Sequence, residues 1–193
     1  DMKKLVAYSS VSHLGFCTLG IFALNPAGIS GSVIQQINHG ISTGALFLIV
    51  GVIYERRHTR MISEFGGICT PMPIYATIFM IVTFSSVGLP GTNGFVGEFL
   101  ILVGSVQRWP IVTWFGFAGL VLGVIYILTV VQKTIFEETR GAQLKEQVLA
   151  DITLREMVIL GSLAAAVLFI GFHPQPILDL FAEPAEVLTA FLK

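Results

Sequence analysis

The sequence predicts an all-α polytopic membrane protein, a bundle of about five transmembrane helices of which one is discontinuous. Of its 193 residues, 54% are hydrophobic and 12% are charged, and the mean hydropathy is +0.82. Soluble domains carry about twice that share of charged residues. One helical crossing needs about 20 apolar residues. Lys, Arg, Asp and Glu are absent from residues 5–54, 109–132 and 157–178, and the only one within residues 65–107 is Glu98.

The first two predicted spans form a helical hairpin. They cover residues 5–24 and 31–54, and the connection 25–28 contains Asn, Pro and Gly, which are residue types that end helices. Two lysines precede the first span, and the basic segment 55–60 follows the second. An excess of Lys and Arg marks cytoplasmic loops, so we expect this end of the hairpin to face the cytoplasm.

Residues 72–107 are predicted to form one transmembrane helix that is broken in its middle, at residues 88–94. The apolar stretch on either side of this GLPGTNG sequence is shorter than the roughly 20 residues of a full span. Two short crossings are the alternative, but they would place the basic loop 133–155 on the outer side, against the charge rule. The residues assigned to the break are Leu89, Pro90, Gly91 and Gly94.

The last two spans are predicted at residues 109–132 and 157–172. The loop 133–155 between them contains four basic residues and is expected in the cytoplasm. The acidic segment after residue 173 is then expected on the outer side, together with the C-terminus. Residues 1–193 read as one membrane-embedded unit in contact with the lipid bilayer. Because the chain starts at Asp1 rather than at Met, we expect it to be the C-terminal part of a longer subunit.

Several classes of chemistry are not expected in this chain. Its 11 basic and 12 acidic residues are balanced, so nothing indicates nucleic-acid binding. Cys17 and Cys69 are too far apart for a zinc motif and too few for a disulfide scaffold. The sequence contains no dinucleotide-binding fingerprint, no Walker A loop and no iron–sulfur cysteine cluster. We therefore expect no metal site, no cofactor and no redox chemistry in the chain itself.

Glu98 is the strongest candidate for a functional residue. An ionisable side chain at membrane depth is costly and indicates function by default. Glu98 follows the predicted helix break, where unpaired backbone groups are tolerated only beside protein or a water-filled cavity. A carboxylate in such a place can bind and release a proton. The alternative is that Glu98 only stabilises the loose ends of the break.

His39 lies in the middle of the second predicted span, within a polar stripe. Gln35, His39 and Thr43 are spaced by four residues and therefore share one face of a helix. Histidine titrates near neutral pH, so this stripe indicates a proton path. The alternative is a hydrogen bond between helices that stabilises the bundle.

His13 is the third ionisable group within a predicted span. Ser9 precedes it by four residues, so the two side chains share a face of the first helix. This pair either extends the proton path of His39 or bonds to neighbouring backbone. The residues leave both interpretations open.

Four segments resemble a known family of membrane subunits. Residues 1–15 (DMKKLVAYSSVSHLG) and 88–99 (GLPGTNGFVGEF) are similar to the antiporter-like subunits of respiratory complex I, NADH-quinone oxidoreductase. Residues 46–56 (LFLIVGVIYER) and 171–179 (GFHPQPILD) resemble the M-type members in particular. The segments occur in the family's order along nearly the whole chain. The resemblance implies that the chain supplies the last five transmembrane helices of such a subunit.

The resemblance also implies roles for individual residues. Glu98 stands where M-type members carry a glutamate and the L- and N-type members a lysine, within the broken helix. His39 matches a family histidine on the preceding helix, and at position 43, where L-type members have a lysine, this chain has Thr43. The resemblance implies proton translocation, coupled to electron transfer from NADH to quinone elsewhere in the complex. Glu98, His39 and His13 would carry the proton, supported by Gln35, Thr43 and Ser9.

The resemblance places the chain in a larger assembly. It implies other membrane subunits of the complex as partners, with L- and N-type neighbours, and a multi-pass location in the inner (plasma) membrane of the cell. Bacterial, mitochondrial and thylakoid membranes all stay open as its source. NADH, FMN, iron–sulfur clusters and quinone would be bound by other subunits. The chain would then belong to an enzyme, a translocase, without performing redox chemistry itself.

Two other functional classes remain open at this point. A subunit of a multi-subunit cation/proton antiporter or of a membrane-bound hydrogenase would share the same fold, because broken helices beside midplane carboxylates are common in ion carriers. A purely structural helix bundle is the third interpretation. It predicts that changes at Glu98 or His39 alter assembly and leave ion coupling unchanged.

Overall fold

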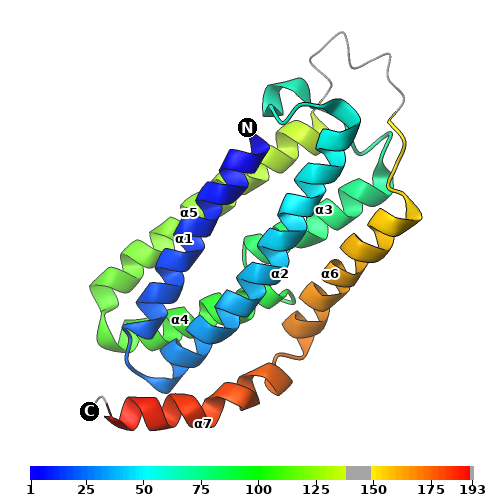
Figure 1. The fold of residues 1–193 in the computed structure, drawn as a ribbon. Coiled ribbons are helices and arrows are strands. Elements are labelled where there is room, and N and C mark those ends of the chain that lie inside the picture. The colour runs from blue at the N-terminus through cyan, green and yellow to red at the C-terminus, as the bar shows by residue number, and fades with distance from the viewer. Residues whose placement is uncertain (138–148, 192–193) are drawn as a thin grey trace.

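The computed structural model describes residues 1–137 and 149–191, and the secondary structure of these residues is helical throughout. A short 3₁₀ helix at Ile62–Glu64 precedes α3, and a π-helical turn at Gln132–Phe136 extends α5. Figure 1 shows an elongated bundle in which most helices run along the long axis while α7 lies across one end. The helices are α1 (Met2–Ile21), α2 (Pro26–Arg57), α3 (Pro73–Ser86), α4 (Asn93–Arg108), α5 (Pro110–Val131), α6 (Leu154–Phe172) and α7 (Gln175–Phe191).

Prolines and capping side chains fix where several helices begin. Pro26, Pro73 and Pro110 each occupy the first turn of a helix, where the missing N–H costs nothing because no helical acceptor is available there. The side chain of Asn25 accepts a hydrogen bond of 2.9 Å from the backbone N–H of Gly28 at the start of α2. These signals explain the abrupt turns between α1 and α2 and between α4 and α5.

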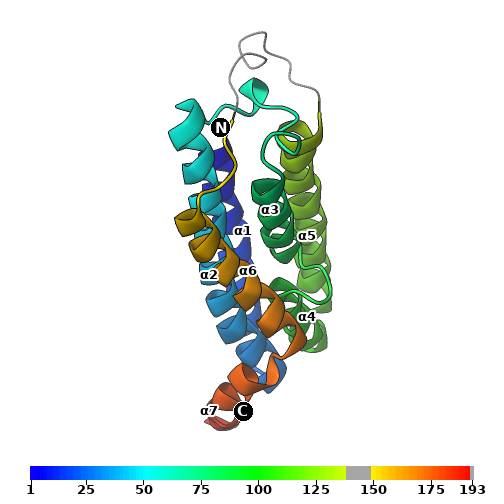
Figure 2. The same ribbon diagram turned by 90° about the vertical axis from the view of Figure 1, so that its right-hand side faces the viewer.

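Three of the described helices, α2, α5 with its π-helical extension, and α6, are long and apolar enough to cross a membrane alone. The helix α3 is apolar but shorter. Figure 2 shows α3 and α4 one after the other along the bundle, with α5 running beside both. The predicted count of about five spans takes α3 and α4 as one interrupted crossing and includes α1, which contains serines and a histidine among its apolar residues.

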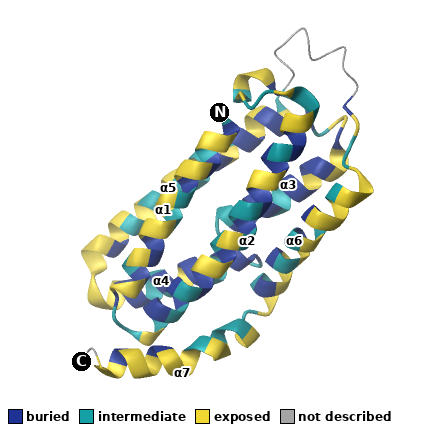
Figure 3. Ribbon diagram, in the orientation of Figure 1, coloured by how far each residue is buried: buried dark blue, intermediate teal, exposed yellow. Residues whose placement is uncertain are grey.

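The core of the bundle is built around α2, which packs against α1, α3, α4, α6 and α7. Figure 3 shows buried positions along α2, whereas much of α5 is exposed. Two glycines let α2 approach α4 closely. A Cβ atom at Gly31 would lie 2.7 Å from the Cβ of Leu100, and one at Gly97 would lie 2.3 Å from Oε1 of Gln35. Small residues at such contacts are typical of helix packing in membranes.

The predicted basic segments meet at one end of the bundle. The guanidinium of Arg56, at the end of α2, donates hydrogen bonds of 2.9 and 2.7 Å to the carboxylate of Glu156, at the start of α6. The carboxylate of Asp151 accepts bonds from the backbone N–H groups of Ile74 and Tyr75 at the start of α3. These contacts join α2, α3 and α6. Residues 138–148 of the predicted loop 133–155 lie outside the described part of the chain.

The segment after residue 173 forms a helix, α7, that the sequence analysis did not predict. It lies at the end of the bundle opposite the N-terminus (Figure 1). Pro176 and Pro184 argued against a helix here. However, Pro176 lies in the first turn, where proline is tolerated, and Pro184 is accommodated inside the helix. One side of α7 packs through Ala185 and Thr189.

Candidate functional site

The break lies between α3, which ends at Ser86, and α4, which begins at Asn93. It is therefore shorter than the predicted range 88–94, and Gly94 belongs to the first turn of α4. Gly88 has a φ of 67° and Gly91 a φ of 93°, backbone conformations that glycine adopts without steric cost. The hydroxyl of Thr92 donates to the carbonyl of Leu89 over 2.7 Å and so satisfies one backbone group within the break. The chain therefore stops being helical in the middle of the bundle, as expected for the discontinuous span.

A set of buried polar side chains holds the break against α2. The side-chain amide of Asn38 donates to the backbone carbonyl of Asn93 over 2.7 Å. The side-chain oxygen of Asn93 accepts from the hydroxyls of Ser85 and Ser42, and these two hydroxyls lie 2.6 Å apart. We call these four residues the break clamp. It links α2 to both halves of the interrupted helix and fixes the register between them.

Glu98 lies on the second turn of α4 and is 6% exposed. Its Oε1 atom is 3.4 Å from Nδ1 of His13 and accepts a hydrogen bond of 3.4 Å from the amide of Gln35. Its other oxygen lies against Gly88, where a Cβ atom would be only 2.2 Å from Oε2. Glu98 is therefore enclosed by α1, α2 and the break itself. Only glycine at position 88 leaves room for the carboxylate in this position.

The two histidines lie next to each other, and His13 is the one that contacts Glu98. The ring centroids of His13 and His39 are 5.3 Å apart with an interplanar angle of 40°. On its other side, the His39 ring contacts the hydroxyl of Thr43, with Nδ1 and Oγ1 3.1 Å apart. The order of contacts is Thr43, His39, His13 and Glu98. Three groups that lie far apart in the sequence thus form a continuous line of titratable side chains.

The structure brings together most of the predicted site residues, with one difference of detail. Gln35 contacts Glu98 directly, whereas it was predicted only as a member of the stripe with His39. Ser9 is buried, and its hydroxyl donates to the backbone carbonyl of Val6 over 2.7 Å. Ser9 therefore lies on the predicted face of α1, one turn before His13.

Two members of the site were missed as functional candidates. Asn93 was regarded only as part of the break sequence, yet it is fully buried and central to the break clamp. Tyr126 lies on α5, which packs against α1, and is partly buried. The position of Asn93 directly after the break sequence could have indicated its role. No feature of the sequence indicates Tyr126, because only tertiary packing places α5 against α1.

Two buried amide oxygens lie near Glu98 and the break. Oε1 of Gln35 and Oδ1 of Asn38 are buried, and no donor among the described residues reaches them. Buried acceptors of this kind are commonly satisfied by internal water. Gln35 contacts Glu98, and Asn38 belongs to the break clamp. The surroundings of Glu98 are therefore polar beyond its titratable neighbours.

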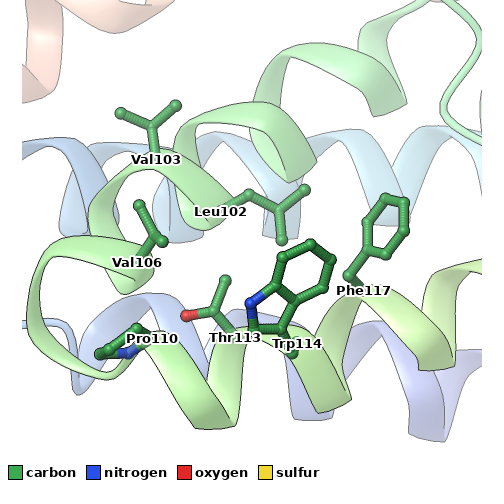
Figure 4. Close-up of a pocket in the computed structure, with 7 residues that line it drawn as sticks. All are labelled: Leu102, Val103, Val106, Pro110, Thr113, Trp114 and Phe117. Carbon is green, nitrogen blue, oxygen red and sulfur yellow. The ribbon is translucent and has the colours of Figure 1, made fainter.

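A second hollow of the bundle has a different character. Between α4 and α5 lies a pocket of about 310 Å³. Figure 4 shows its apolar side chains around Thr113, whose hydroxyl donates to the backbone carbonyl of Trp109. No ionisable side chain lines this pocket. His13, His39 and Glu98 lie together elsewhere in the bundle. The pocket is lined by Leu102, Val103, Val106, Pro110, Thr113, Trp114 and Phe117.

Comparisons with known proteins agree with this architecture. Residues 1–125 match the family model described as NADH:quinone oxidoreductase/Mrp antiporter, TM. NADH-quinone oxidoreductase subunit M of Rhodobacter capsulatus is 48% identical over 189 residues, which cover 98% of this chain and 36% of that protein. The chain thus spans little more than a third of the length of this relative.

Solved structures give the same result. A chain of respiratory complex I from Thermus thermophilus with bound NADH aligns with a TM-score of 0.92 at 32% identity, over all of this chain and 40% of that one. A chain of the Mrp complex from Dietzia sp. DQ12-45-1b aligns with a TM-score of 0.84 at 19% identity, over 95% of this chain and 42% of that one, and shares the fold. The chain therefore belongs to the NADH:quinone oxidoreductase/Mrp antiporter family of transmembrane proteins and is homologous to subunit M of NADH-quinone oxidoreductase.

Proposed function

We propose that this chain forms part of a non-redox membrane subunit that translocates protons in an NADH:quinone oxidoreductase. The observation that carries the proposal is the contact of 3.4 Å between His13 and the buried Glu98, with the ring of His39 next to that of His13. Its homology to subunit M supports the assignment to this type of complex. Electron transfer from NADH to quinone would take place in other subunits and would drive changes of charge at this site.

The pair of His13 and Glu98 is suited to hold one mobile proton. A lone charge at membrane depth is costly, whereas an imidazolium next to a carboxylate forms an ion pair. If the proton moves from Nδ1 of His13 to Oε1 of Glu98, both groups become neutral and the net charge of the pair is unchanged. The proton can therefore move within the pair without creating an isolated buried charge.

His39 extends this path along α2. An imidazole can accept a proton on one ring nitrogen and release a proton from the other, so two adjacent rings can pass a proton in sequence. The Thr43 hydroxyl next to His39 supplies either a donor or an acceptor, depending on the tautomer. We assign His39 the relay to the rest of the membrane domain and His13 the exchange with Glu98.

The helix break supplies the polar surroundings that this chemistry requires. The close approach of Gly88 places the backbone of the break against the carboxylate. The break clamp keeps the two helix halves in register, so that Gln35 and His13 stay within reach of Glu98. We assign the break clamp a structural role and Glu98 the proton-loading role.

The proposal also covers the environment of the chain. The end of the bundle that carries Arg56 and Glu156 would face the cytoplasm, and α7 would lie on the outer side of the inner membrane. L- and N-type subunits would be its membrane neighbours, and NADH, FMN, iron–sulfur clusters and quinone would be held by other subunits. The charge rule for membrane loops supports this orientation.

The test is the number of protons pumped per NADH oxidised in membrane vesicles that carry Glu98→Gln in the full-length subunit. We expect the complex to assemble on a native gel and to pump far fewer protons per NADH. Glu183→Gln, on the exposed surface of α7, is the matched control and should pump normally. Normal pumping by an assembled Glu98→Gln complex would remove Glu98 from the path.

A cation/proton antiporter subunit is the second candidate, because the matched family includes Mrp antiporters and the Mrp chain shares the fold. It predicts proton flux in vesicles that depends on a sodium gradient and needs no NADH. Flux that requires NADH oxidation and is indifferent to sodium would exclude this candidate.

A further inference from the structure

We infer that the hollow between α2 and α6 binds one phosphatidylethanolamine lipid. Arg155 holds the phosphate, Glu55 holds the ammonium group, and an acyl chain lies against the apolar part of the hollow. No residue of the line from Thr43 to Glu98 contributes to this hollow, so the site is independent of the proposed proton path.

The hollow has a volume of about 390 Å³ and is lined by facing sides of two helices that pack against each other (Figure 1). On α2 its lining extends from Phe47 to Glu55, which is about 12 Å of helix at about 1.5 Å per residue. On α6 its lining extends from Arg155 to Leu160, within the first two turns. The hollow therefore runs along the helices from the basic end of the bundle toward its interior.

The lining changes from charged to apolar along this direction. Glu55 and Arg155 lie at the end of the hollow that is nearest to the basic end of the bundle. Phe47 and Leu48 line its other end and are 36% and 44% exposed in this chain. A phospholipid has the same order of groups, because its charged headgroup lies at the membrane surface and its hydrocarbon lies below. A small soluble ion would leave the apolar part of the hollow uncovered.

Two charged side chains of the lining are available to a ligand. The carboxylate of Glu156 already accepts two hydrogen bonds from Arg56, so these two charges balance each other. Glu55 and Arg155 each precede a member of that pair in the sequence, and both are exposed. Neither side chain forms a hydrogen bond or an ion pair within residues 1–137 and 149–191. The hollow thus offers one cation and one anion that are not paired.

This combination of charges favours a zwitterionic headgroup with a primary amine. A guanidinium binds phosphate through parallel hydrogen bonds, which makes Arg155 the partner of the lipid phosphate. The ammonium group of phosphatidylethanolamine donates to the carboxylate of Glu55. Phosphatidylglycerol has a phosphate but no cation for Glu55. A choline headgroup has no N–H to donate and binds best to aromatic faces, which are absent from the charged end of the lining.

Gly51 provides space for the acyl chain. It lies in the lining of the hollow, and a Cβ atom built on it would meet no other atom within 4 Å. A leucine at this position would fill the hollow without contacting the backbone of α6. Gly51→Leu is therefore a variant that excludes the lipid without changing either charge.

Photochemical labelling tests the site directly. The complex that contains the full-length subunit would be reconstituted in vesicles with a trace of a lipid that carries a diazirine on one acyl chain. Three such probes would be compared: phosphatidylethanolamine, phosphatidylcholine and phosphatidylglycerol. After illumination, mass spectrometry measures the labelled fraction of the peptides that contain residues 47–52 and 159–160.

We expect phosphatidylethanolamine to label these peptides at least about tenfold more than either other lipid, because a hydrogen bond between charged groups contributes that much to binding. Equal labelling by all three lipids would mean that the hollow contains unselected bilayer lipid. Absence of labelling by every probe would mean that a segment of a neighbouring protein covers the hollow. Either result would overturn the inference.

The two charges are tested one at a time. We expect Arg155→Gln and Glu55→Gln each to reduce labelling by phosphatidylethanolamine to the level of phosphatidylcholine, and Gly51→Leu to abolish it. Lys3→Gln and Glu64→Gln remove exposed charges at the same end of the chain that do not line the hollow, and should leave labelling unchanged. A preference for phosphatidylethanolamine that survives in both Arg155→Gln and Glu55→Gln would overturn the assignment of these residues.

Discussion

Nδ1 of His13 lies 3.4 Å from Oε1 of Glu98, although the two residues are 85 positions apart in the sequence. The contact joins α1 to the second half of the interrupted helix. It exists because the break turns the chain at Gly88 and lets α4 pack along both α1 and α2. The contact between His13 and Glu98 thus depends directly on the helix break.

The order of the proton path predicts how the histidine variants combine. We expect His13→Gln and His39→Gln each to lower the number of protons pumped per NADH, because either change interrupts the line of side chains that ends at Glu98. The double variant of His13→Gln with Glu98→Gln should pump no less than Glu98→Gln alone, since both block the same path. A clearly additive loss would mean that the two residues serve separate routes.

Two glycines of the break should respond differently to alanine. At Gly88, a Cβ atom would meet the flexible end of Glu98, so Gly88→Ala should displace the carboxylate and reduce pumping in an assembled complex. The positive φ adds strain of about 1–3 kcal/mol. At Gly94, the Cβ atom would lie 2.0 Å from the backbone oxygen of Ser85, which cannot move aside, so Gly94→Ala should impair assembly.

The check for these two variants is a native gel combined with the pumping ratio. Gly119→Ala is the matched control, because a Cβ atom there would meet no other atom within 4 Å. Loss of assembly in Gly88→Ala, or normal assembly in Gly94→Ala, would contradict the steric argument.

The break clamp should contribute to stability more than to chemistry. Asn93→Ala removes the side-chain oxygen that accepts from the Ser85 and Ser42 hydroxyls, so these two hydroxyls can bond only to each other, and a buried polar group left without a partner costs about 1–3 kcal/mol. We expect a lower temperature of thermal inactivation of NADH oxidation. Ser162→Ala removes an exposed polar group of α6 and should change this temperature little. Equal effects of the two variants would refute the assigned role.

The ion pair at the basic end should be specific for arginine. Arg56 donates to both oxygens of Glu156 and to the backbone carbonyls of Ala150 and Asp151, a pattern that a lysine cannot reproduce. We expect Arg56→Lys to lower the stability of the assembled complex by about 1–2 kcal/mol, measured as faster proteolytic cleavage. The double variant of Arg56→Lys with Glu156→Gln should lose less stability than the sum of the losses in the two single variants. A loss equal to that sum would show that the pair does not act as a unit.

The general architecture could be predicted from the sequence because membranes constrain it strongly. Long uncharged stretches indicate helices, and the proline- and glycine-rich sequence at 88–94 indicates the break between α3 and α4. The helix α7 was missed because its two prolines, Pro176 and Pro184, and its acidic residues are typical of a loop. The structure shows that both prolines are compatible with the helix.

The candidate site could be predicted only in part. His13, His39 and Glu98 stand out because ionisable groups are rare within apolar sequence. Their mutual distances, and the contact of Gln35 with Glu98, follow from how α1, α2 and α4 pack. Periodicity within single helices does not contain that information. The same holds for Tyr126, which only tertiary packing brings to α1.

The most direct test of the central claim is to observe the protonation of Glu98 during turnover. Infrared difference spectroscopy of the assembled complex, recorded with and without NADH, reports carboxyl groups that gain or lose a proton. We expect a carbonyl band of a protonated carboxylic acid that changes on addition of NADH and is absent from the Glu98→Gln complex. Identical difference spectra for the unaltered complex and the Glu98→Gln complex would show that Glu98 does not change its protonation and would contradict the account.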